Sequence, residues 1–184
     1  MMVITFRAKT FRFLELFGLA AIIGGIVAGT FFFGGFFSVA ANHPDPEIIN
    51  WMLIHVRKAS IARHATDRPP GSLDDPALVR AGALAYSQNG CINCHGGPGM
   101  EPAKFSEGLN PAPNLKRVVN DLLPQELFWI IKNGIKMTGM PSFSASNPPV
   151  PDQEIWAMVA FLKKLQSISS EDFKAWSATP AGAQ

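Results

Sequence analysis

The chain has 184 residues, of which 47% are hydrophobic and 16% are charged, and its formal net charge is +2. This length allows one domain of moderate size plus an appendage, and the low charge content indicates a membrane segment. Only three of the 16 basic and one of the 14 acidic residues precede Asn42, so the rest of the chain is neutral and offers no basic field for nucleic acid.

The N-terminal part predicts a single membrane anchor. No charged residue occurs from Leu16 to Ala41, a run longer than the roughly 20 residues that a helix needs to cross the hydrocarbon core. Arg7, Lys9 and Arg12 precede it, so the positive-inside rule places residues 1–15 in the cytoplasm and the rest on the periplasmic side of the inner membrane. A cleaved signal peptide is the alternative, but its apolar core spans only about 7–15 residues. We therefore expect a retained anchor over residues 16–41.

Residues 42–73 predict a break, a second helix and a linker. The sequence His43-Pro44-Asp45-Pro46 is expected to end the membrane helix. From about Pro46 to Ala65 apolar residues recur at helical spacing, opposite basic ones. Such a helix either lies on the membrane or on a partner, or packs on the domain that follows. The apolar positions are Ile48, Trp51, Met52, Val56 and Ala59, and the basic ones are Arg57, Lys58 and Arg63.

Residues 74–168 predict a helical domain. Asp75 followed by Pro76 indicates a helix start, and Gly82 inside that helix indicates a close crossing with another helix. A second helix is expected over Pro124–Asn133, closed by Gly134, and a last one after Pro151, with Asp152 as N-cap, to about Leu165. The extension 169–184 holds one more short turn.

The chemistry of the chain centres on Cys91-Ile92-Asn93-Cys94-His95. C-x-x-C-H is the attachment signature of a c-type haem: the two thiols bond the porphyrin edge, and His95 offers the proximal iron ligand. A thioredoxin-like redox pair would need a βαβ context that the sequence lacks. A structural zinc site would need four ligands, and His43, His55 and His64 show no ligand spacing to the cysteines. A disulfide across so short a loop would add little stability.

A methionine in a glycine- and proline-rich loop offers a second iron ligand. Met140 lies between Gly139 and Pro141, and its soft thioether can bind iron opposite His95 and raise the reduction potential. Met137 is the next choice and Met100 a distant third.

These motifs resemble the class I c-type cytochromes, specifically the membrane-anchored monohaem ones. The resemblance covers Asp74 to Leu165 and rests on the C-x-x-C-H motif, on Pro113-Asn114-Leu115, on Gly139-Met140-Pro141 and on the aromatic last helix. It implies an all-α fold of three main helices around one covalent haem c, the first and last of them crossing. It also implies that the carbonyl of Pro113, or else of Pro111, accepts a hydrogen bond from His95.

The sequence thus predicts an electron carrier of a respiratory chain rather than an enzyme. Its expected partners are a quinol-oxidising complex, a dehydrogenase or a terminal oxidase. Two alternatives stay open: a permanent haem subunit of a larger membrane oxidoreductase, and a haem-based gas or redox sensor.

Overall fold

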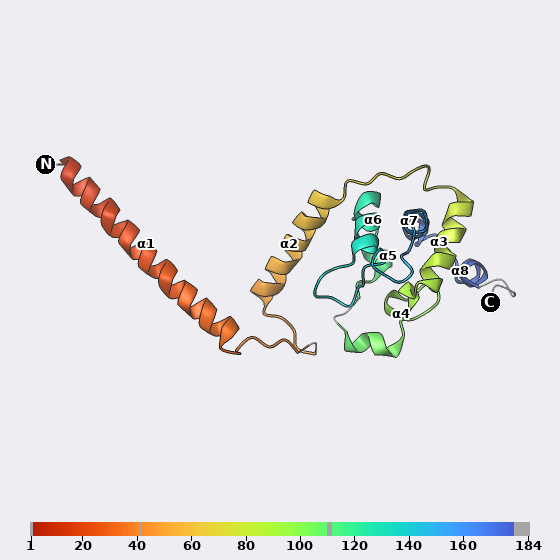
Figure 1. Cartoon of the computed structure of the whole chain (residues 1–184), viewed down its shortest axis with the longest axis horizontal. Coiled ribbons are helices and arrows are strands. Elements are labelled where there is room, and N and C mark those ends of the chain that lie inside the picture. Colours follow the sequence, from red (N-terminus) through yellow and green to blue (C-terminus); the bar gives the residue numbers. More distant parts are fainter. Residues whose placement is uncertain (1, 41, 110–111, 179–184) are drawn as a thin grey trace. The chain divides into compact units, whose positions relative to one another are not determined.

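The computed structural model describes residues 2–40, 42–109 and 112–178, without the side chains of residues 2–10. Figure 1 shows that these residues form helices joined by loops, and they contain no β-strand. The chain divides into two compact units, Met1–Asp45 and Pro46–Gln184. The predicted all-α fold class is confirmed.

The first unit consists of helix α1 (Met2–Phe33) and the segment that follows it. Its stretch Phe11–Phe33 has 23 residues with a mean hydropathy of 2.2, and none of its most apolar window is buried. At 1.5 Å per residue this stretch is about 35 Å long, enough to cross the hydrocarbon core of a bilayer.

The end of α1 differs from the sequence prediction. The helix stops at Phe33, not near Ala41, and the expected break at His43-Pro44 lies well beyond it. Gly34 donates its N–H to the carbonyl of Thr30 (2.8 Å), and Gly35 adopts a positive φ of 79°, which ends the helix. Arg12 and Glu15 consequently lie inside the apolar stretch, whereas Ala41 is outside the described residues.

The second unit contains the other helices. They are α2 (Glu47–His64), α3 (Pro76–Gln88), α4 (Cys91–His95), the 3₁₀ helix η1 (Lys104–Gly108), α5 (Leu115–Val118), α6 (Pro124–Asn133), α7 (Asp152–Lys164) and α8 (Ser170–Ser177). The helices predicted around α2, α3, α6 and α7 are therefore present, and the short turn expected after residue 168 is the helix α8. The segment between α4 and α6 contains η1 and α5.

Helices α3 and α7 cross at Gly82. A Cβ atom built on Gly82 would overlap the carbonyl of Ala157 and lie 2.9 Å from Cβ of Phe161. In Figure 1 α7 is seen end-on, whereas α3 is seen from the side. The absence of a side chain at Gly82 is what lets the two backbones meet, as the sequence predicted.

The core of the unit is aromatic. Phe128 of α6 stacks on Trp156 of α7 with ring centroids 4.2 Å apart, and both rings are buried. Phe173 of α8 stacks on Phe161 of α7 at 5.5 Å, next to Tyr86 of α3. Helix α8 is therefore part of the packed domain, and its buried ring ties α3 to α7.

The first residue of α7 behaves differently from the prediction. Pro151 stands at the N-cap position and no side chain caps the helix, whereas Asp152 is the first helical residue. The Asp152 carboxylate instead pairs with Lys132 of α6 at 2.7 Å. A long-range ion pair has replaced the expected local cap.

Helix α2 packs against α6 through only one of its faces. Ile61 is buried, and the His64 ring lies against Trp129 with centroids 6.1 Å apart. The apolar positions singled out in the sequence lie on another face of α2 and are exposed, including Trp51 and Val56.

Candidate functional site

The short helix α4 carries both cysteines and places Cys91 next to the core. Gly90 precedes it with a positive φ of 75°, which turns the chain sharply after α3. Cys91 and Cys94 are half-buried, and Cys91 and Ile92 pack on the hydrophobic core. Burial raises the pKa of the Cys91 thiol to about 12. The Cys91 thiol therefore lacks the low pKa that thiol–disulfide exchange requires.

His95 closes α4 and is held by a backbone carbonyl. Its Nδ1 lies 3.2 Å from the carbonyl oxygen of Pro113, so in the tautomer that donates there Nε2 is left as the ligand nitrogen. Burial lowers the pKa of the imidazole, partly offset by this hydrogen bond. A neutral ring with Nε2 available is the form that binds iron. Pro111, the alternative carbonyl, lies outside the described residues.

The turn after His95 is held by contacts with Tyr86 and Phe173 on two sides. The Tyr86 hydroxyl donates to the carbonyl of Gly96 at 2.7 Å, in a buried position. Burial raises the pKa of Tyr86, so this hydroxyl stays protonated and can donate. On the other side the ring of Phe173 lies so close to Gly97 that a Cβ there would be 2.6 Å from it. These contacts fix the loop that leaves the motif.

The loop after α6 distinguishes its two methionines. Met140 is half-buried and packs on the core, its N–H donates to Oγ1 of Thr138 at 3.2 Å, and its carbonyl accepts from Ile135. Met137 lies at the loop tip with a positive φ of 63° and is 87% exposed. Of these two methionines, only Met140 therefore packs against the core.

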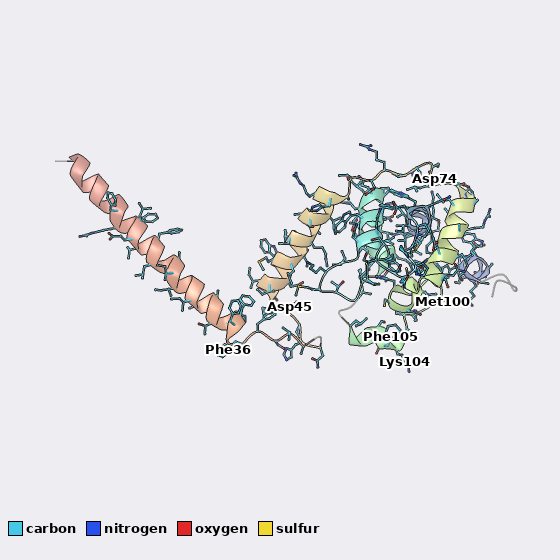
Figure 2. The ribbon with its side chains drawn as sticks, in the orientation of Figure 1. Phe36, Asp45, Asp74, Met100, Lys104 and Phe105 are labelled. Carbon is cyan, nitrogen blue, oxygen red and sulfur yellow. The ribbon has the colours of Figure 1, made fainter. Side chains whose placement is uncertain are left out.

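Two loops meet beside this methionine. A Cβ on Gly139 would lie 3.1 Å from Cδ1 of Leu109, which follows η1. Met100, Phe105 and Leu109 are exposed apolar side chains in the segment between the motif and Pro113. Figure 2 labels Met100, Lys104 and Phe105 along this segment.

The remaining histidines that the sequence considered lie elsewhere. His55 and His64 each place Nδ1 against the carbonyl four residues back in α2, at 2.7 Å and 2.8 Å. Among the residues that the structure describes, no three His, Cys, Asp or Glu side chains converge to hold a metal ion.

The donors that are present suit a haem. Two half-buried thiols three residues apart, an oriented imidazole and a thioether are the donor set of a His/Met c-type haem, and two of these residues, Cys91 and Met140, pack on the apolar core. Phe128, Ile131, Trp156 and Val159 of this core are buried, and Ile92 and Leu115 are packed against it.

Sequence reasoning missed the part that α8 plays. Phe173 and Ser170 lie against Gly97 and Gly99, more than 70 residues away in sequence. The lack of side chains at Gly97 and Gly99 makes room for α8.

Comparison with known proteins gave one match. Residues 77–162 match the family described as cytochrome C oxidase, cbb3-type, subunit III. The matched segment extends from α3 through most of α7 and so includes α4, Pro113 and Met140. No curated protein and no solved structure matches the chain.

Proposed function

Since the chain is a membrane-anchored c-type cytochrome, we propose that it transfers single electrons in a respiratory chain through one covalently attached haem c. The proposal rests above all on one contact, the 3.2 Å approach of His95 Nδ1 to the carbonyl of Pro113. This hydrogen bond fixes the imidazole directly after the two thiols and increases its basicity. Cys91 and Cys94 would hold the haem, and His95 would bind its iron.

Met140 is the second residue that we propose would hold the haem iron. Its half-buried side chain packs on the core, whereas Met137 is exposed to solvent. A bound haem supplies an iron that alternates between the ferrous and ferric states. If His95 and Met140 both held the iron, they would leave no open position for a substrate, so the role that we propose is that of a carrier and not of an enzyme at this site. The apolar surroundings keep water out and favour the less charged ferrous state.

The membrane topology follows from charge and hydropathy. We propose a cytoplasmic N-terminus over residues 1–15, a single retained anchor before Asn42, and a periplasmic part made of residues 42–73, the haem domain 74–168 and the extension 169–184. The apolar stretch Phe11–Phe33 supports the anchor. A tether keeps the haem domain near its redox partners and raises their effective concentration. Those partners would be a quinol-oxidising complex, a dehydrogenase or a terminal oxidase.

A second candidate function is a permanent haem subunit of a larger membrane oxidoreductase. The match of residues 77–162 to an oxidase subunit family favours it. The two functions share the same haem site and differ only in whether the chain leaves its partners. Blue-native electrophoresis of a mild detergent extract separates them, because a free carrier migrates alone and a subunit migrates with its complex.

The proposal is tested on the full chain produced with the cytochrome maturation machinery. We expect about one haem per chain, retained through extraction with acidified acetone and lost in Cys91→Ser with Cys94→Ser. The reduced protein should bind carbon monoxide slowly or not at all. A haem that is extracted from wild type would contradict covalent attachment, and rapid carbon monoxide binding would favour the sensor instead.

A further inference from the structure

Helix α2 has apolar side chains on two opposite faces. One face contains Ile54 and the buried Ile61 and contacts α6. The other carries large apolar side chains that no part of the second unit covers: Ile48 is 68% exposed, Trp51 58%, Met52 45% and Val56 61%. A helix between solvent and a domain needs only one apolar face, so the second one calls for another contact.

The exposed side chains form a continuous stripe. Ile48, Trp51, Met52 and Val56 recur at intervals of three and four residues, so they lie on one side of the helix. The stripe continues through exposed Ala59 and Ala62 to the C-terminal end of α2. Trp51 packs on His55, one turn further along the helix, with ring centroids 4.3 Å apart. We call these six residues, 48, 51, 52, 56, 59 and 62, the α2 stripe.

Charge and chain length point to the surface of the lipid bilayer. Arg57, Lys58 and Arg63 are exposed, and Glu47 is the only acidic residue of α2. Basic side chains beside an apolar stripe that contains a tryptophan are typical of helices that lie in an anionic membrane interface. Residues 34–46 are all that separate Phe33 from α2, a span of at most about 45 Å when fully extended. A membrane crossed by α1 is therefore always within reach of the stripe.

We propose that the α2 stripe lies in the headgroup region of the bilayer that α1 crosses, with anionic phospholipid as its ligand. A second copy or a partner subunit would have to be encountered by diffusion, whereas the tether presents the bilayer at a constant high effective concentration. This inference rests on the proposed membrane anchor. It adds that α2 joins the haem domain to the lipid surface, because its opposite face packs on α6.

The consequence is an oriented haem domain. A domain on a flexible tether would sample all orientations, whereas a domain held by α2 keeps its α6 side toward the membrane. Its other sides, including the segment with Met100 and Phe105, then face a limited set of directions. Redox partners can approach the domain only from those directions. The α2 stripe therefore restricts which complexes can reach the site.

The test uses the full chain, with haem, reconstituted in vesicles of phosphatidylcholine and phosphatidylglycerol. Some vesicles carry brominated acyl chains, which quench tryptophan fluorescence at short range. The difference between wild type and Trp51→Phe isolates Trp51 from the other tryptophans. We expect the bromine-dependent quenching to fall by at least about half in Trp51→Phe, as for an interfacial side chain. Unquenched Trp51 in wild type would overturn the proposal.

Two matched variants identify the face involved. Ile48→Glu and Asn50→Glu introduce the same charge two residues apart, on opposite sides of the first turns of α2, and both positions are exposed. Ile48→Glu should weaken the quenching, and Asn50→Glu should leave it unchanged. Equal effects of the two would refute the stripe. Quenching that is lost as the protein-to-lipid ratio is raised would instead assign the stripe to a second copy and also refute the proposal.

Absorption spectra of the same samples separate this inference from the proposed function. Neither variant touches the haem site, so both should keep the wild-type spectrum. Loss of the haem in wild type would overturn the electron-transfer function, whereas the quenching of Trp51 reports only on the contact between α2 and lipid.

Discussion

Replacing Gly82 by alanine tests the helix crossing on which the domain is built. In an ordinary helix interior this change stabilises, because alanine is favoured over glycine by about 1 kcal/mol. At Gly82 the new methyl group would lie 2.5 Å from the carbonyl carbon of Ala157. That position is about 1 Å inside van der Waals contact, and the neighbour is backbone that no rotamer change can move. The sign of the effect should therefore reverse.

The expected loss follows from these two opposing terms. Overpacking in a core costs about 1–3 kcal/mol or more, and here α3 and α7 must separate along their closest contact. After subtraction of the helix-propensity gain, we expect a net destabilisation of about 2 kcal/mol. For a unit of this size that corresponds to a fall in Tm of roughly 6–8 °C. The assay is thermal unfolding of the haem-loaded full chain in detergent, followed by circular dichroism.

Two control variants make the result interpretable. Ala81 is exposed next to Gly82 in α3, so Ala81→Gly should cost only the propensity difference of about 1 kcal/mol. Gly71 has no atom within 4 Å of an added Cβ, so Gly71→Ala should leave Tm unchanged or slightly raised. A Gly82→Ala protein that is as stable as wild type would refute the close crossing.

Two further predictions concern the loop after the C-x-x-C-H motif. Tyr86→Phe removes the buried hydrogen bond to Gly96 and keeps the ring, so urea unfolding should show a loss of about 1–3 kcal/mol; a change below about 0.5 kcal/mol would mean that water replaces the hydroxyl. Phe173→Ala removes a fully buried ring and should cost about 3–5 kcal/mol, with faster hydrogen exchange at the Gly97 amide, which donates to Met100. Phe105→Ala, at a ring that is 62% exposed, is its control and should leave both measurements unchanged.

The parts of the fold that the sequence predicted well are those specified by neighbouring residues. Pro76 and Pro124 start their helices at the first position, and Gly134 ends α6 with a positive φ of 68°. The Asp75 carboxylate accepts from the N–H of Ala77, as its place before Pro76 predicted. Such signals are local, so an unaligned sequence contains them in full.

The structure differs from the prediction where a helix end or a contact depends on residues distant in sequence or on a second local signal. The uncharged run to Ala41 shows only how far the apolar sequence extends. The end of the helix at Phe33 is determined by Gly34 and Gly35. Asp152 was predicted as an N-cap from its place after Pro151. Its ion pair with Lys132 involves a residue of another helix, which the local sequence does not reveal. The same limit applies to the site, since the packing of Phe173 on Gly97 joins residues far apart in the chain.

The haem ligands predicted from sequence fall into two groups. Cys91, Cys94 and His95 lie within one short motif and were predicted from its spacing. The hydrogen-bond partner of His95, Pro113, was predicted from family resemblance alone. The sequence ranked Met140 before Met137 because Met140 lies between Gly139 and Pro141, but both methionines lie in the same loop. Their exposure in the folded chain is what separates them.

The central claim, a haem bound by His95 and Met140, is tested most directly by absorption spectra of three proteins. Oxidised and reduced spectra are taken of wild type, Met140→Ala and Met137→Ala, each extracted in detergent. We expect a low-spin c-type spectrum for wild type and for Met137→Ala, and a high-spin ferric spectrum for Met140→Ala. A low-spin Met140→Ala protein beside a high-spin Met137→Ala protein would contradict it and assign the iron to the exposed methionine.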